Sequence, residues 1–308
     1  MNSESSTRDG PLGAREIRLL RAASYASMLV ALALIVLKAW AWVATDSVAL
    51  LSSLADSILD LLASAVTFFA VKVAVSPADS EHRFGHGKSE GISSLVQAVI
   101  VTGSAAYVGI EAVARLIVPS PIRQPDIGIA VMLVSLALTT GLIVFQSIVV
   151  RRTGSLAISA DSVHYRADLM SNVAVLAAIF LSVRWDLYVV DPLLGLVVVV
   201  LILISVRTIV GQALDVLLDR ELPDEERDRI QVIGASHPEV RGLHDLRTRS
   251  SGSAQFIQFH LELDPHLSLA RAHEICDSVE RDIRQAFPTA EVLIHADPLG
   301  VPEDRDPF

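Results

Sequence analysis

The sequence predicts an α-helical membrane protein followed by a smaller α+β domain that lies in water. Hydrophobic residues make up 52% of the 308-residue chain, and the mean hydropathy is +0.50. Charged residues make up 19%, below the roughly 25% that is usual for soluble domains. Residues 1–213 hold 15 acidic and 15 basic side chains, whereas residues 214–308 hold 20 acidic and 10 basic ones. The net charge therefore lies in the last third, which indicates two parts with different solvents.

Six stretches are long and apolar enough to cross a bilayer, which takes roughly 20 residues each. They are residues 22–44, 48–75, 90–118, 126–150, 156–183 and 187–212. The second and the fifth are the least apolar, and their assignment depends on their neighbours. Around these six transmembrane helices we predict a polar N-terminal arm (1–21), a membrane domain (22–213), a soluble domain (214–298) and a C-terminal tail (299–308). The arm lacks the apolar core and the cleavage site of a signal peptide, so we expect it to be retained.

Basic residues gather on one side of the predicted spans. They are Arg8, Arg15, Arg18, Arg21, Lys72, Arg83, Lys88, Arg151 and Arg152. The opposite side has only Arg115, Arg123 and Arg184. Loops rich in Lys and Arg stay in the cytoplasm, so both termini are predicted to be cytoplasmic. The single cysteine, Cys276, cannot form an internal disulfide, which fits a reducing compartment.

Two acids lie on one face of the second predicted span. The stretch ADSILDLLAS, residues 55–64, places Asp56 and Asp60 four residues apart and therefore on one side of a helix. The fifth span repeats this spacing with His164 and Asp168, and Asp161 lies one turn earlier on the same side. Each charge at bilayer depth costs roughly 2.5–3.5 kcal/mol. We therefore expect the two faces to meet around a cation.

Three carboxylates and one imidazole form a ligand set that suits tetrahedral Zn²⁺. Cd²⁺, Fe²⁺ and Co²⁺ fit as well, because affinity alone discriminates poorly between divalent ions. The imidazole disfavours Mg²⁺ and Ca²⁺. The alternatives are acids that line a water-filled cavity, acids that pair with Arg166 and Lys38, and a proton relay without metal. Lys38, in the first span, is expected either to snorkel to an interface or to face the bundle interior.

A second group of possible ligands lies between the second and third spans. The stretch PADSEHRFGHGK contains Asp79, His82 and His86. Gly85 and Gly87 argue against a regular helix, so the spacing of the two histidines is weak evidence by itself. We expect a polar loop with the composition of a modest Zn²⁺ site, or a polar loop that binds no metal.

The soluble part has the pattern αββαβ. Residues 223–236 have helical spacing, residues 242–252 and 254–263 alternate as two strands of a hairpin, and residues 290–297 form a closing strand. Residues 268–287 form an amphipathic helix with Ser268 as its candidate cap. Two helices on one face of such a sheet make a compact domain.

Histidines concentrate in this soluble part. The candidate metal ligands there, drawn from four elements, are His244, His260, His273, His295 and Asp297. His295 and Asp297 are two residues apart, so both point to the same side of a strand. A metal cluster is the prediction, and scattered surface histidines are the alternative.

These motifs together resemble the cation diffusion facilitator family, and within it the bacterial zinc and ferrous-iron efflux branch. They are ADSILDLLAS, SPADSEHRFGHGKSE and HYRAD, followed by LLDRELPDEE, HDLRTR, FIQFHLE and IHADP. The likeness runs in order from about residue 20 to residue 298. It implies a homodimeric metal²⁺/H⁺ antiporter in the bacterial inner membrane, with a cytoplasmic ferredoxin-like domain and no nucleic-acid partner.

The resemblance also implies roles for particular residues. Asp161 would be an accessory acid beside a transport site formed by Asp56, Asp60, His164 and Asp168. Asp297 would bridge two metal ions in the soluble domain. Lys88 would pair with Asp219, joined by Arg249, near the dimer interface.

The predicted function is proton-coupled export of Zn²⁺, with Cd²⁺ or Fe²⁺ as alternatives, and Zn²⁺ also as a structural or regulatory ion. A membrane metalloenzyme would need an open coordination position and a general base, and the sequence has no HExxH-type signature. A non-transporting metal sensor would not need ligands inside the membrane.

Overall fold

The computed structural model describes residues 13–45, 48–117, 126–185 and 190–301. The described chain forms two compact units, one over residues 14–214 and one that begins at Asp215. These units agree in type with the predicted membrane and soluble parts.

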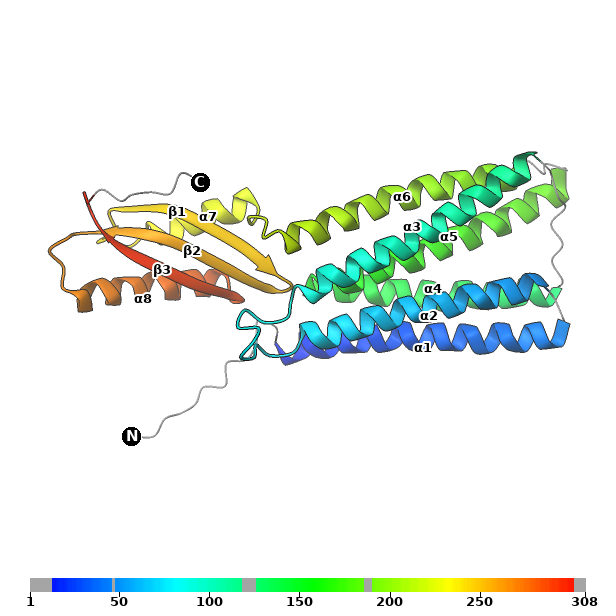
Figure 1. Ribbon diagram of the computed structural model, residues 1–308, viewed down its shortest axis with the longest axis horizontal. Helices are drawn as coiled ribbons and strands as arrows, with labels where there is room; N and C mark the ends of the chain where they lie inside the picture. Colours follow the sequence, from blue (N-terminus) through cyan, green and yellow to red (C-terminus); the bar gives the residue numbers. More distant parts are fainter. Residues whose placement is uncertain (1–12, 46–47, 118–125, 186–189, 302–308) are drawn as a thin grey trace, which may run out of the picture. The chain divides into compact units, whose positions relative to one another are not determined.

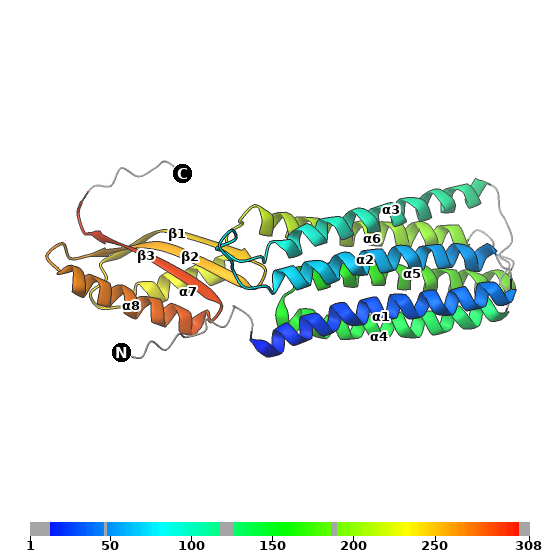
Figure 2. The same ribbon diagram turned by 60° about the horizontal axis from the view of Figure 1, so that its bottom comes forward.

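The first unit contains six long helices (Figure 1). They are α1 (Ala14–Thr45), α2 (Val48–Ala74), α3 (Ser89–Ile117), α4 (Asp126–Thr153), α5 (Leu156–Trp185) and α6 (Val190–Leu217). Helix α1 packs against α2 and α4, and α5 packs against α2, α3 and α4. Val198, Ile202 and Val206 of α6 are buried with apolar side chains of α3 and α5. The helices run alongside one another in both views of the bundle (Figure 2).

Five of these helices are long and apolar enough to cross a membrane, judged over the described residues: α1, α2, α3, α4 and α6. The prediction of a helical membrane domain is therefore confirmed. Helix α5 is not among the helices that meet this criterion over the described residues. Its crossing of the membrane stays a prediction. Helix α1 begins at Ala14, within the predicted arm, so the last part of that arm is helical.

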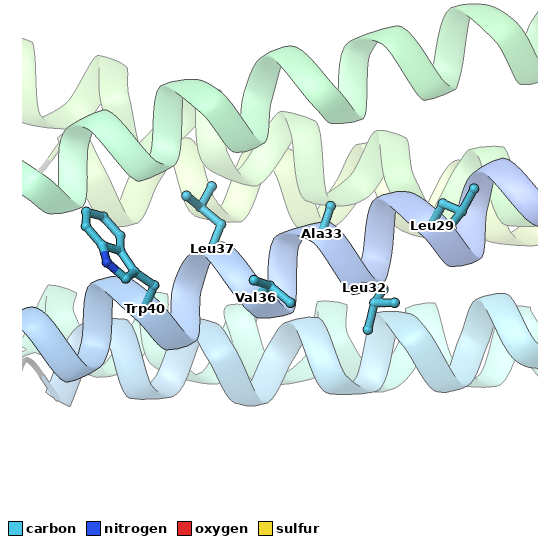
Figure 3. A pocket seen from close by; sticks show the side chains of 6 residues that line it. All are labelled: Leu29, Leu32, Ala33, Val36, Leu37 and Trp40. Carbon is cyan, nitrogen blue, oxygen red and sulfur yellow. The ribbon is translucent and has the colours of Figure 1, made fainter.

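One side of α1 presents only apolar side chains. A shallow groove there is lined by Leu29, Leu32, Ala33, Val36, Leu37 and Trp40, all from α1 (Figure 3). Leu29 is 64% exposed and Trp40 is 62% exposed. Large exposed apolar surfaces are rare on soluble proteins and normal on helices that contact lipid. This surface is therefore suited to acyl chains.

The second unit has the predicted order αββαβ. Its elements are α7 (Asp224–Gly234), β1 (Gly242–Ser251), β2 (Ala254–Leu263), α8 (Leu269–Ala286) and β3 (Ala290–Pro298). The sheet has the order β1-β2-β3, with β1 antiparallel and β3 parallel to β2. The turn between β1 and β2 uses Gly252 at φ +61°, which glycine adopts without strain. The Ser268 side chain accepts a hydrogen bond from the Arg271 backbone N–H and caps α8, as predicted.

Alternation along β2 separates a core face from a polar face. Ile257, Phe259 and Leu261 are buried against α7 and α8, in a core that includes Ile230 and Ile283. Side chains of a strand alternate between the two faces of its sheet. His260 therefore lies on the face away from this core, where it can meet polar groups of the neighbouring strands.

Candidate metal centres

The helices α2 and α5 bring together Asp60, His164 and Asp168. One ligand atom from each lies within 4.8 Å of the others. His164 Nε2 lies 3.1 Å from Asp60 Oδ1 and 3.7 Å from Asp168 Oδ2. His164 is buried, and Asp168 Oδ2 is a buried atom that accepts no hydrogen bond within the described chain. A buried carboxylate oxygen without a donor is costly, and a cation would satisfy it. This donor set fits a borderline divalent metal ion.

Asp56, the fourth predicted ligand, lies outside this three-residue cluster. Its side chain is exposed, whereas Asp60, one turn later on α2, is partly buried. The two carboxylates repel each other, and Lys38 attracts Asp56. The structure thus brings three of the four predicted ligands together and leaves Asp56 close in sequence but apart from them.

Asp161, the predicted accessory acid, is enclosed by protein donors. Its Oδ2 accepts hydrogen bonds from Ser27 Oγ and Gln146 Nε2, each at 2.6 Å. Its Oδ1 accepts one from Thr67 Oγ1 at 3.4 Å. These donors come from α1, α4 and α2, and the Asp161 side chain has no exposed surface. Gln97 Nε2 of α3 also donates to Oδ1 at 3.5 Å, so the contacts join five helices around one carboxylate. The role of this acid in an ion pathway stays a prediction.

Glu90 is a buried acid that the sequence reasoning missed. It lies in the first turn of α3, and its two oxygens accept hydrogen bonds from Ser155 Oγ at 2.9 Å and from the Leu156 backbone N–H at 2.8 Å. The carboxylate therefore caps the start of α5, where backbone N–H groups attract negative charge. It connects the start of α3 to the helix that carries His164. Only the fold reveals this pairing, because 65 residues separate Glu90 from Ser155.

The loop between α2 and α3 brings Asp79, His82 and His86 together. Their ligand atoms lie within 4.8 Å of one another. Asp79 Oδ1 lies 3.4 Å from His82 Nδ1, and Asp79 Oδ2 lies 3.3 Å from His86 Nε2. The backbone N–H groups of His82 and Glu81 donate to Asp79, and these bonds, that of His82 above all, lower the pKa of Asp79 below its usual value. The carboxylate is thus held ionised and oriented towards both imidazoles.

We expect Asp79→Asn to weaken Zn²⁺ binding at this loop by about tenfold or more, because it removes the only negative ligand of the three. The amide oxygen still accepts the two backbone N–H groups, so the loop should keep its conformation. Calorimetric titration of Zn²⁺ into detergent-solubilised protein measures the change, with the exposed neighbour Ser80→Ala as control. Identical titrations for Asp79→Asn and Ser80→Ala would refute a metal site here.

The polar face of the sheet holds a cluster around Asp297. His244, His260 and Asp297 offer ligand atoms within 4.8 Å of one another. Asp297 Oδ2 lies 2.7 Å from His260 Nδ1 and 3.5 Å from His244 Nε2, and Asp297 Oδ1 lies 3.1 Å from His295 Nε2. The strand register explains this, because His244 pairs with His260 and His260 pairs with His295. Asp297 Oδ2 thus faces His244 and His260, and Asp297 Oδ1 faces His295. A carboxylate that bridges two ions would be arranged in this way.

His273 lies apart from the Asp297 cluster. It is on α8, where its Nε2 lies 3.6 Å from Asp277, and its side chain is 75% exposed. Two acids that were not predicted approach the cluster instead. Glu262 Oε1 lies 3.2 Å from His244 Nδ1, and Asp245 Oδ2 lies 3.9 Å from His260 Nε2. Four of the five predicted residues are therefore together, and the role of His273 stays a prediction.

Part of the predicted ion-pair network is present within the second unit. Arg249 Nη1 lies 3.3 Å from Asp219 Oδ1. Lys88 belongs to the first unit, immediately before α3. Its pairing with Asp219 would join the two units and stays a prediction.

Comparison with known proteins gives the family. The family model described as the cation efflux transmembrane domain matches residues 24–218. The chain belongs to the cation efflux family. A second family model, the cytoplasmic domain of cation efflux proteins, matches residues 222–299. These matches confirm the resemblance and the combination of a helical membrane domain with an α+β domain.

Several relatives of this cation efflux protein match along nearly their whole length. It is 44% identical to the cation-efflux pump FieF of Cronobacter sakazakii, over 92% of this chain and 94% of the relative. It is also 44% identical to the cation-efflux pump FieF of Yersinia enterocolitica, over 94% and 96%. A solved structure described as the mode of action of a putative zinc transporter, CzrB, is 36% identical. It covers 26% of this chain and 99% of the solved chain, with a TM-score of 0.25.

Proposed function

We propose that this protein exports divalent transition-metal ions from the cytoplasm in exchange for protons, with Zn²⁺ as its first substrate. The observation that carries the proposal is the Asp60–His164–Asp168 cluster, which lies between two helices of the membrane unit of a cation efflux protein. Ionisable side chains buried between such helices commonly mark the path of an ion or a proton. The relatives that match nearly the whole chain are named cation-efflux pumps, which supports the same role.

The geometry supports transport by alternating access. Asp60, His164 and Asp168 offer three ligand positions, and Asp56, one turn earlier on α2, would supply a fourth once a metal draws it in. An ion between α2 and α5 offsets the repulsion between the carboxylates and favours a closed arrangement of the two helices. His164 can bind either a proton or a metal ion, so protons that arrive from outside would displace the metal there. An inward proton gradient would then drive export.

The proposal also covers the oligomeric state of the protein, its location and its regulation by metal. We infer a homodimer, which the match to the cytoplasmic domain of cation efflux proteins supports. The bacterial relatives support a location in the inner membrane, and the basic residues on one side of the spans support cytoplasmic termini. Metal at the Asp297 cluster would strengthen the dimer and regulate transport. The acidic balance of residues 214–308 would raise the local concentration of cations.

Flux measurements on purified full-length protein in liposomes test this function. We expect Zn²⁺ to accumulate against its gradient when the proton gradient is directed oppositely, and the lumenal pH to change as Zn²⁺ moves. Competition by Cd²⁺, Fe²⁺ and Co²⁺ ranks the substrates. Zn²⁺ binding without flux would instead indicate a sensor, and Zn²⁺ flux without proton movement would exclude the antiport.

A further inference from the structure

Lys38 places an ammonium group inside the helical bundle. Its Nζ donates a hydrogen bond to Ser57 Oγ at 2.7 Å and another to the Ser53 backbone carbonyl at 3.1 Å. Both acceptors belong to α2, and Ser57 is buried. Of the two orientations that the sequence left open, the structure therefore shows the one that faces the bundle interior. A long side chain held in this way cannot also snorkel to an interface.

The Lys38 ammonium lies in the field of the predicted transport ligands. The carboxylates of Asp60, Asp168 and Asp56 attract it electrostatically. Ser57, its hydrogen-bond acceptor, lies on α2 between Asp56 and Asp60. The lysine, on α1, is thus anchored by two uncharged groups of α2. It acts on the carboxylates through space. Because the effective dielectric constant inside a helical bundle is lower than that of water, such a field is stronger there than in water.

With a neutral His164, the charges of the four predicted ligands and Lys38 balance for a divalent ion. Asp56, Asp60 and Asp168 together carry three negative charges when ionised, and Lys38 carries one positive charge. A divalent ion with a neutral His164 makes the sum zero, whereas a monovalent ion leaves a net negative charge and a trivalent ion a net positive one. Net charge in the membrane interior is costly, so the state loaded with a divalent ion is the favourable one.

We propose that Lys38 sets the affinity and charge selectivity of the transport site. Its positive charge opposes the bound cation and so limits how tightly the carboxylates hold it. An ion pathway needs binding strong enough for entry and weak enough for release. This inference rests on the proposed function, since it needs the Asp60–His164–Asp168 cluster to be the transport site.

The test compares Lys38→Met with Lys38→Arg in liposomes that contain the full-length protein. At about pH 8, where carboxylates are normally ionised, we expect Lys38→Met to lower the half-saturating Zn²⁺ concentration about tenfold. The maximal rate should fall as well, because release slows. Lys38→Arg retains the charge and should resemble wild type. Lys72→Met, which removes a lysine from the exposed last turn of α2, is the matched control and should change neither value.

Further variants separate charge from structure. Ser57→Ala removes a hydrogen-bond acceptor of Lys38 but leaves its charge, so the half-saturating concentration should stay near that of wild type. If Lys38→Met does not fold, Lys38→Gln makes the same comparison. An unchanged or raised half-saturating concentration in a folded, uncharged variant overturns the role of Lys38. A different result would refute the proposed transport site itself. That result is Zn²⁺ transport by Asp60→Ala, measured in the same series, at the wild-type rate.

Discussion

Replacing Asp60 by alanine is expected to abolish Zn²⁺ transport in protein that still folds. Asp60 is the α2 ligand of the cluster, with its Oδ1 3.1 Å from His164 Nε2. Without it, the remaining ligands of the cluster, His164 and Asp168, both lie on α5, so a metal ion would no longer join the two helices. We expect the initial rate of Zn²⁺ flux into liposomes to fall at least about 100-fold, the upper range for lost metal-site partners.

Glu111→Gln is the matched control for this experiment. Glu111 is also an acid of a membrane helix, α3, but does not belong to the Asp60–His164–Asp168 cluster. Its variant should keep most of the wild-type rate. Equal rates for Asp60→Ala and Glu111→Gln, or wild-type rates for Asp60→Ala, would contradict the assignment. Asp56→Ala belongs in the same series: a loss as large as that of Asp60→Ala would show that Asp56 joins the metal-bound site.

The sequence predicted those features that depend on short-range periodicity. Residues four apart on a helix share a face, so His164 and Asp168 had to lie together once α5 was a helix. Asp60 lies beside these two residues, as predicted, because α2 and α5 also pack together. The αββαβ order followed in the same way from alternating strands and one amphipathic helix with a Ser268 cap. Local patterns therefore located the elements and most of the ligands.

Features that depend on contacts between distant segments were not predictable. Glu90 meets Ser155, and Asp161 meets Ser27 and Gln146, through helix packing that no local pattern encodes. The approach of Asp245 to His260 depends on the irregular register of β1 after His244, where Asp245 adopts a positive φ of 49°. The direction of Lys38 was undecided for the same reason, because only its contacts with α2 fix it.

Asp297 is expected to determine metal binding by the second unit. It is buried, and its two oxygens face three imidazoles from three strands. Each strand supplies a histidine at a matching register position, so a single carboxylate contacts all three. Asp297→Asn preserves the shape of the side chain but removes its charge and replaces one oxygen by a donor. We therefore expect Zn²⁺ affinity at this cluster to fall about 100-fold.

Hydrogen exchange of the full-length protein with and without Zn²⁺ measures this loss of affinity in the individual strands of the sheet. A ligand at 100 times its dissociation constant stabilises the folded state by about 2.7 kcal/mol, so Zn²⁺ should slow exchange in β1, β2 and β3 of the wild type. Asp297→Asn should remove most of that protection. Asp282→Asn, an exposed acid on α8, should retain it. If Zn²⁺ protects the strands equally in both variants, the metal lies elsewhere. Since Asp297 joins all three strands, only loss of protection in all of them would show that it bridges the cluster.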